Sequence, residues 1–160
     1  MKKLLLALVA LLVVTGASAQ DWSVGGRVGS GFQALGQYKL SAENYVEARF
    51  GAAWFPGVNA DFTALYNWHL LDFDWTPSAG KWFFDAGVGL NVGGQSHFAY
   101  FGAAGMARLG FTFNEAPITL AFDYTPVLGM NFHYAKGFKT NVGYHGAGWG
   151  NFGFSCTYNF

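Results

Sequence analysis

Apolar and polar side chains alternate along most of the chain after residue 20, as they do in strands that lie between two different environments. Eight stretches carry the alternation, separated by turn-type residues: 22–30, 32–40, 44–54, 60–70, 81–92, 98–113, 117–126 and 149–160. In the fourth, Phe62 and Tyr66 stand on one face, against Asp61 and Asn67 on the other. The pattern predicts an all-β chain of eight antiparallel strands.

The charged residues indicate which environment each face meets. Lys81, at the very start of the fifth stretch, is counted with the preceding turn. Every other charge within the eight stretches lies on the polar face, four of each sign: Arg27, Lys39, Arg49, Arg108, Glu47, Asp61, Asp85 and Asp123. Turning the four basic residues toward lipid would cost about 2–4 kcal/mol each near the midplane. We therefore expect the apolar face to meet lipid and the charges to neutralise one another in a narrow lumen. A selectivity lining is the alternative interpretation of the same charges.

Composition favours a membrane barrel over a water-soluble domain. Residues 20–160 hold all 6 Trp, 8 Tyr and 17 Phe and 22 of the 23 Gly, but only 7 basic and 9 acidic residues. That is too apolar for disorder and too poor in charge to coat a soluble surface. The balance of −2 gives no basic excess for nucleic acid. A closed barrel satisfies every backbone polar group in lipid, and glycines on the polar face leave room inside it.

The first residues have the three parts of a secretory signal. Lys2 and Lys3 precede the apolar run Leu4–Val14, and Ala17-Ser18-Ala19 forms a small-residue cleavage site. We expect residues 1–19 to be a cleavable signal peptide and residues 20–160 to form a single barrel domain. An N-terminal anchor helix is the alternative. The single cysteine, Cys156, rules out an internal disulfide.

One connection is much longer than the others. With short turns on the periplasmic side, as is usual in such barrels, the segment 127–148 becomes the longest external loop. Its candidate interaction residues are Phe132, His133, Tyr134, Lys136, Lys139, Tyr144 and His145. Long external loops suit recognition, so an unknown external partner is expected here. A merely solvated loop is the alternative.

The last residues resemble the C-terminal strand of Gram-negative outer-membrane proteins. Phe152, Phe154, Tyr158 and Phe160 alternate to the end, although Cys156 departs from the usual residue type. Three further blocks, 44–48, 65–69 and 117–126, are similar to those of small OmpX-like eight-stranded barrels. The resemblance implies residence in the bacterial outer membrane, contact with its lipid and lipopolysaccharide, insertion by the barrel-assembly machinery, and a role in surface interaction or envelope integrity.

Candidate chemistry is sparse. Some eight-stranded barrels modify lipid A, but the His-x-Ser-Asn string of the lipid A deacylases is missing, and the neighbours Ser96 and His97 point to opposite faces of a strand. The spacing of His97, His133 and His145 matches no metal-ligand motif. We expect a monomeric structural or surface-interaction protein, without enzymatic activity, cofactor or metal. A narrow pore for small solutes is the first alternative, and a lipid A-modifying enzyme the second.

Overall fold

The computed structural model describes residues 21–54, 58–74, 77–95, 98–133, 139–144 and 150–160, with the backbone alone at 133 and 139–144. The expected signal peptide, residues 1–19, lies outside these ranges. In the described part of the chain, no helix is long and apolar enough to cross a membrane.

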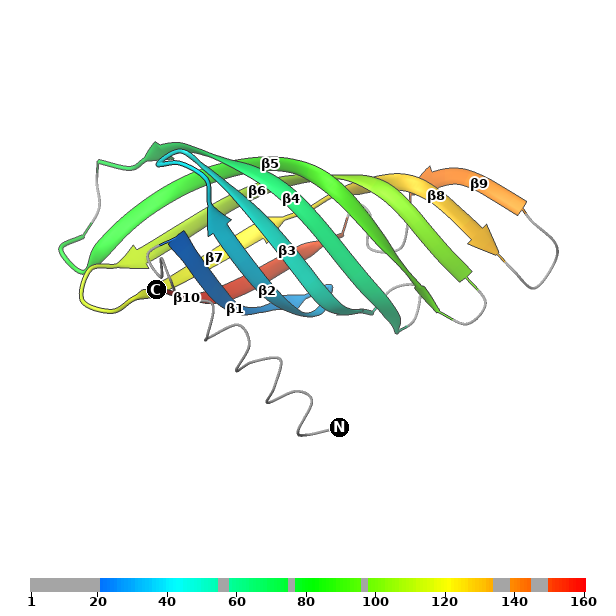
Figure 1. Cartoon of the computed structure of the whole chain (residues 1–160), viewed down its shortest axis with the longest axis horizontal. Coiled ribbons are helices and arrows are strands. Elements are labelled where there is room, and N and C mark those ends of the chain that lie inside the picture. The colour runs from blue at the N-terminus through cyan, green and yellow to red at the C-terminus, as the bar shows by residue number, and fades with distance from the viewer. Residues whose placement is uncertain (1–20, 55–57, 75–76, 96–97, 134–138, 145–149) are drawn as a thin grey trace.

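The described residues form ten strand segments joined in antiparallel pairs (Figure 1). Their bounds are β1 Trp22–Gly29, β2 Gly31–Lys39, β3 Asn44–Ala53, β4 Asn59–Asp72, β5 Gly80–Gln95, β6 Phe98–Phe113, β7 Ile118–Tyr124, β8 Val127–His133, β9 Lys139–Tyr144 and β10 Phe152–Asn159. Each of β1 to β6 pairs with the next strand along the chain, so that β6 pairs with β7, and β7 then pairs with β10. The pairing of β1 with β10 closes the circle.

The ten segments occupy eight positions around a closed antiparallel barrel, because β7 and β8 pair with successive parts of β6, and β10 and β9 pair in turn with β7 and β8. Thr125 and Pro126 interrupt this barrel strand. Pro126 has no N–H to donate, but its carbonyl oxygen accepts a hydrogen bond from the Gly105 N–H at 2.9 Å, so the two halves stay in line. The predicted fold class, an all-β chain with an eight-stranded antiparallel barrel, is confirmed.

The predicted external loop 127–148 is wrong in its first part. Val127–His133 forms β8, and Lys139–Tyr144 pairs back against it as β9. We took Pro126 as the end of a strand, yet the alternation continues beyond it: Leu128 and Met130 are exposed, and Val127 is buried. The described parts of the segment, β8 and β9, therefore pair as a β-hairpin that lengthens one side of the barrel, at the end opposite the C-terminus (Figure 1).

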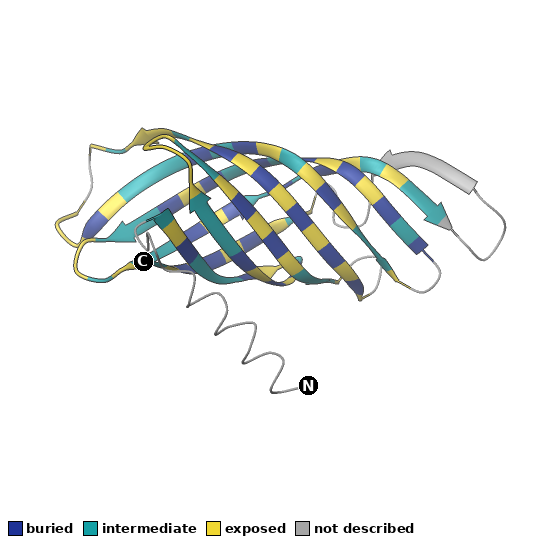
Figure 2. Cartoon of the chain, viewed as in Figure 1, coloured by how far each residue is buried: buried dark blue, intermediate teal, exposed yellow. Residues whose placement is uncertain are grey.

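Buried and exposed residues alternate along almost every strand (Figure 2). Among the described residues, the large apolar side chains are mostly exposed and the polar side chains buried. Phe50 on β3 is 66% exposed, for example, whereas its neighbour Arg49 is 1% exposed. The polar faces of the strands thus point into the barrel, and the apolar faces point outward.

The start of β1 and the end of β10 meet at one end of the barrel, which we call the turn end. The Phe160 N–H donates to the Trp22 carbonyl at 3.0 Å there. The turn between β2 and β3 lies at the same end and is closed by the N–H groups of Leu40 and Ser41, which donate to the Asn44 carbonyl at 2.9 and 3.1 Å. The β8–β9 hairpin lies at the other end, the hairpin end.

Candidate functional site

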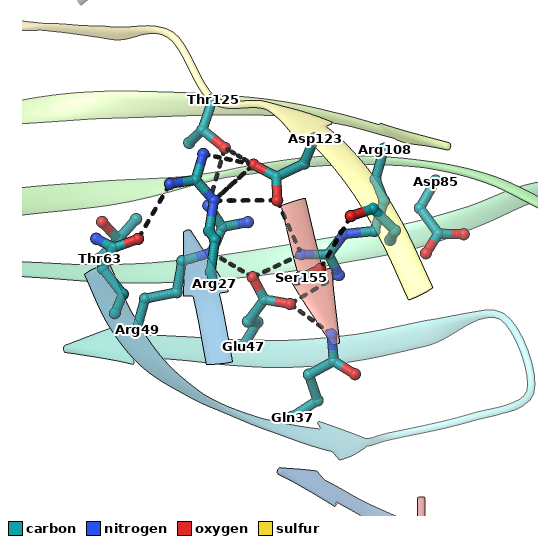
Figure 3. A network of polar contacts seen from close by, with 12 residues as sticks. Arg27, Gln37, Glu47, Arg49, Thr63, Asp85, Arg108, Asp123, Thr125 and Ser155 are labelled. Carbon is teal, nitrogen blue, oxygen red and sulfur yellow. Dashed lines mark hydrogen bonds and ion pairs between the residues drawn. The ribbon is translucent and has the colours of Figure 1, made fainter. Parts of the chain in front are cut away.

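Three arginines and two carboxylates meet in the middle of the barrel, and Figure 3 shows them converging. All five are at most 2% exposed, and together we call them the mid-barrel network: Arg27 on β1, Glu47 and Arg49 on β3, Arg108 on β6 and Asp123 on β7. They come from four strands because inward-pointing side chains of a narrow barrel reach across it. Buried charges need such partners, since leaving water unpaired costs several kcal/mol per ion.

Asp123 is shared by arginines from two strands. Arg27 donates from Nε and lies with Nη2 2.8 Å from Asp123 Oδ1. Arg49 Nη1 lies 3.3 Å from the same oxygen and donates to Thr125 Oγ1 at 3.0 Å. The Thr125 hydroxyl in turn donates to Asp123 at 3.0 Å. Asp123 Oδ1 therefore faces donors from three side chains.

Glu47 is the second centre of the network. Arg108 reaches it with both terminal nitrogens, at 2.7 Å to Oε2 and 2.9 Å to Oε1. Two-pronged contacts of this kind are among the strongest charge-assisted hydrogen bonds. Arg49 Nε and Gln37 Nε2 complete the donors around Glu47.

Asp61 lies nearer the hairpin end and is held by neutral donors. The Tyr100 hydroxyl donates to it at 2.6 Å and Asn91 Nδ2 at 2.8 Å, and Gln33 Nε2 adds a third hydrogen bond. Gln33 also accepts from Arg27 Nη1 at 3.2 Å. Asp61 is therefore joined to the mid-barrel network through one amide side chain.

A β-bulge organises the groups nearer the turn end. The pairing of β4 with β5 shifts between His69 and Leu71, so Asp72 comes to the same face as His69. The ring of His69 then lies between two carboxylates, with Nδ1 2.9 Å from Asp85 and Nε2 3.3 Å from Asp72. Tyr45 donates to Asp85 at 2.7 Å and accepts from Arg108 Nη1 at 3.0 Å, which connects this group to the network.

Lys39 is a correction to the predicted lumen set. The structure buries Arg27, Glu47, Arg49, Asp61, Asp85, Arg108 and Asp123 inside the barrel, but leaves Lys39 exposed at the last residue of β2. Alternation predicted correctly which face of the strand carries Lys39. It did not show that Lys39 lies at the very end of β2, where its long side chain reaches solvent. The described interior therefore has three arginines against four carboxylates, not four charges of each sign.

Glycines on the inner face leave the space that the arginines occupy. A Cβ built on Gly153 would lie 2.3 Å from the Cζ of Arg27, and one built on Gly87 would lie 2.0 Å from Asn67 Oδ1. Contacts that short cannot exist, so a side chain at either position would displace a buried polar group. Gly36 faces outward and meets nothing within 4 Å.

The interior opens into a cavity of about 340 Å³ at the turn end. Its walls carry hydroxyl, amide and charged groups, including Tyr45, His69, Asp72 and Asp85. Arg108 contributes to the lining from the mid-barrel side. This turn-end cavity is a polar recess next to the network.

The other predicted site residues belong to the β8–β9 hairpin and to the C-terminal residues. Phe132 and His133 belong to β8, and Lys139 and Tyr144 to β9, whereas Tyr134, Lys136 and His145 lie outside the described residues. The aromatic residues at the C-terminus lie on the outer surface, each between 44% and 48% exposed: Phe152, Phe154, Tyr158 and Phe160.

Several hydrogen-bond partners of the buried charges lay on the predicted polar faces but were not predicted as site residues. They are the neutral and aromatic partners Gln33, Tyr45, His69, Asn91, Tyr100 and Thr125. Their position on the inward face of the alternating pattern was the one sequence feature that could have indicated them. Their partners were not predictable, because these depend on how the strands are staggered around the barrel.

The arrangement is built for charge neutralisation. Among the described residues, no three His, Cys, Asp or Glu side chains are grouped to hold a metal ion. Comparison of the chain with protein-family models, with curated proteins and with solved structures finds no match. The molecule is thus defined by its own architecture, as a closed eight-stranded barrel with a charged, side-chain-filled interior and an apolar outer surface.

Proposed function

We propose that this chain is an integral outer-membrane β-barrel whose filled lumen does not conduct, and that it acts as a structural or surface-interaction protein through its hairpin end. The observation that carries the proposal is the distribution of polarity. Phe32 on β2, Val88 on β5 and Leu128 on β8 are each 55–58% exposed, so the apolar surface continues around the barrel. Water-soluble monomers rarely expose contiguous apolar patches larger than a few hundred Å².

A bilayer is the environment that suits this surface. The closed barrel pairs its strands all around, so lipid meets no open sheet edge along the closed part of the wall. The buried guanidinium groups would be the costliest groups in lipid, and each lies inside the barrel with a carboxylate partner. Contact with outer-membrane lipid and lipopolysaccharide, and insertion by the barrel-assembly machinery, belong to the same proposal.

The mid-barrel network argues against a pore. Its ion pairs join β1 to β7 and β3 to β6, and a further pair lies within β3, all at distances of direct contact. An ion passing through would have to break several buried ion pairs. Planar-bilayer recordings of the folded protein are expected to show a flat current baseline. Discrete conductance steps would contradict the closed lumen and support the narrow-pore alternative.

The hairpin end offers a specific mode of interaction. Among the described strands, β9 pairs only with β8, so the outer edge of β9 carries no strand partner. Such an edge can add an extended peptide by backbone hydrogen bonds. A partner that contributes an extended strand would suit this edge, and the rest of the barrel wall has no equivalent described edge at that end.

The membrane proposal is tested by heat modifiability. Folded in detergent, the protein should migrate faster on an electrophoresis gel than after boiling, because a closed barrel stays compact in detergent until heated. High solubility without detergent, together with no difference in migration, would contradict membrane residence and favour a soluble barrel.

The interaction proposal is tested on the edge of β9 itself. Asn141→Pro and Val142→Pro form a matched pair of variants. Backbone N–H groups alternate sides along a strand, so one of these prolines removes an N–H that faces β8 and the other removes an N–H that faces outward. A displayed library of random peptides is selected against the folded barrel in lipid nanodiscs. The outward proline should abolish peptide selection while leaving the heat shift intact. Selection of the same peptides by both variants and by the unaltered protein would contradict edge pairing.

A further inference from the structure

The turn-end cavity has hydrogen-bonding capacity that the protein does not use. Its volume of about 340 Å³ is within the range of small-molecule sites, and it is lined almost entirely by polar side chains. The mid-barrel network lies at its inner side, where Arg108 forms part of the lining. The question is which chemistry the unused groups would complement.

The first unused group is on Arg108. Its two terminal nitrogens bond to Glu47 and Tyr45, but its Nε is buried and has no acceptor among the described residues. Arg108 is only 2% exposed. A buried donor left without an acceptor costs about 1–3 kcal/mol, more when charged, so an acceptor oxygen from a ligand would be stabilising here.

Two ammonium groups add to this donor. Lys39, at the last residue of β2, and Lys81, near the first residue of β5, both line the cavity. In the described structure neither forms a hydrogen bond or ion pair. They come from strands that are not neighbours, so they approach the cavity from different parts of its wall.

The two carboxylates of the cavity, Asp72 and Asp85, both face the ring of His69. Asp85 receives the Tyr45 hydroxyl on one oxygen and the His69 ring on the other. Asp72 faces the second nitrogen of the same ring. Asp85 is thus bonded through both oxygens, and Asp72, whose side chain is 55% exposed, turns one oxygen toward His69. Lys39, Lys81 and Arg108 Nε, in contrast, are donors without a described partner.

We propose that the turn-end cavity binds a small oxyanion, a carboxylate or phosphate group, through Lys39, Lys81 and Arg108. The two lysines supply charge at the wall, and Arg108 supplies a directed donor at the inner side. Neighbouring hydroxyl groups such as those of Ser155 and Thr157 belong to the same lining and suit an oxygen-rich ligand. The site needs only the closed barrel, and does not depend on residence in a membrane.

Isothermal titration of the full folded chain in a zwitterionic detergent tests the site, with inorganic phosphate and acetate as separate probes. Lys39→Gln and Lys81→Gln each remove one charge, and each should weaken binding of the better probe by about tenfold. Lys139→Gln on β9, at the opposite end of the barrel, is the matched control and should leave the affinity unchanged.

Asp72→Asn separates an anion site from the alternatives. Removing this negative charge should tighten oxyanion binding several-fold, because the ligand no longer meets a like charge. Weaker binding in Asp72→Asn would mean that a cationic or zwitterionic group is recognised, and would overturn the proposal. Failure of both probes to bind, or equal weakening by Lys139→Gln and Lys81→Gln, would overturn it as well. The relative affinity of the two probes then distinguishes a phosphate-bearing ligand from a carboxylate.

Discussion

The mid-barrel network and the turn-end cavity are built from the same residue types, but use them differently. In the network each carboxylate receives several donors, and Asp123 alone binds two arginines and one threonine. In the cavity, Lys39, Lys81 and one nitrogen of Arg108 have no described partner. The comparison teaches that buried charge alone does not mark a functional site in this barrel. Donors without a described partner are the better guide: the network holds Arg49 Nη2 and Arg108 Nε, and the turn end adds the ammonium groups of Lys39 and Lys81.

Asp123→Asn should break the network most severely. The change leaves Arg27 and Arg49 without their shared carboxylate inside the barrel, and removing one partner of a buried ion pair costs about 3–5 kcal/mol. Urea unfolding in detergent micelles, followed by the gel heat shift, measures the loss. Asp74→Asn, at an exposed carboxylate, is the control and should be near neutral. Equal stability of the two variants would show that the network does not hold the barrel together.

Gly153→Ala should come next, because it forces a methyl group against the Arg27 guanidinium, 2.3 Å from Cζ. Overpacking of this kind costs about 1–3 kcal/mol. Gly36→Ala, where nothing lies within 4 Å, should change the unfolding free energy far less. Similar midpoints in urea for the two alanine variants would contradict the steric role of Gly153.

Tyr45→Phe tests the link between the two regions. The hydroxyl donates to Asp85 and accepts from Arg108, so its removal leaves two buried groups short of a partner. We expect a loss of about 1–2 kcal/mol in unfolding free energy. Tyr66→Phe on the outer surface is the control and should cost little. A neutral Tyr45→Phe would mean that network and cavity are independent.

Lys39→Gln should have the smallest effect on stability, within about 0.5 kcal/mol, because the side chain is exposed and has no described ion pair. The same change should nevertheless weaken oxyanion binding, which makes Lys39 the clearest residue for separating stability from binding. Urea unfolding of Lys39→Gln beside Arg49→Gln measures the contrast. A loss in Lys39→Gln as large as that in Arg49→Gln would return this lysine to the structural set.

Much of the barrel could be predicted from the sequence, because alternation and charge each depend on local position. Tyr45 and Arg108, for example, were both placed on the inner face, but their contact depends on the stagger between β3 and β6. That stagger is a property of the closed barrel and leaves no local signal. The bulge after His69 was missed for a similar reason, since two consecutive leucines there looked like an ordinary strand end.

The hairpin was missed because Pro126 is a strong local signal for the end of a strand. Its effect is overridden by β6, which is long enough to pair with β7 before the proline and β8 after it. The length of β6 thus allows Val127–His133 to form a strand. Local sequence could not show that such a template would be present.

The salt bridge between Arg27 and Asp123 also constrains the order in which the barrel can assemble. The two residues are 96 positions apart in the sequence, and Arg49 is 74 positions from the same carboxylate. A chain that has formed only its first four strands holds Arg27 without its carboxylate, and in the proposed membrane setting an unpaired guanidinium is costly. Early hairpins are therefore not stable stopping points. On the proposed membrane residence, the charge of Arg27 is neutralised by Asp123 only once β7 has joined the barrel wall.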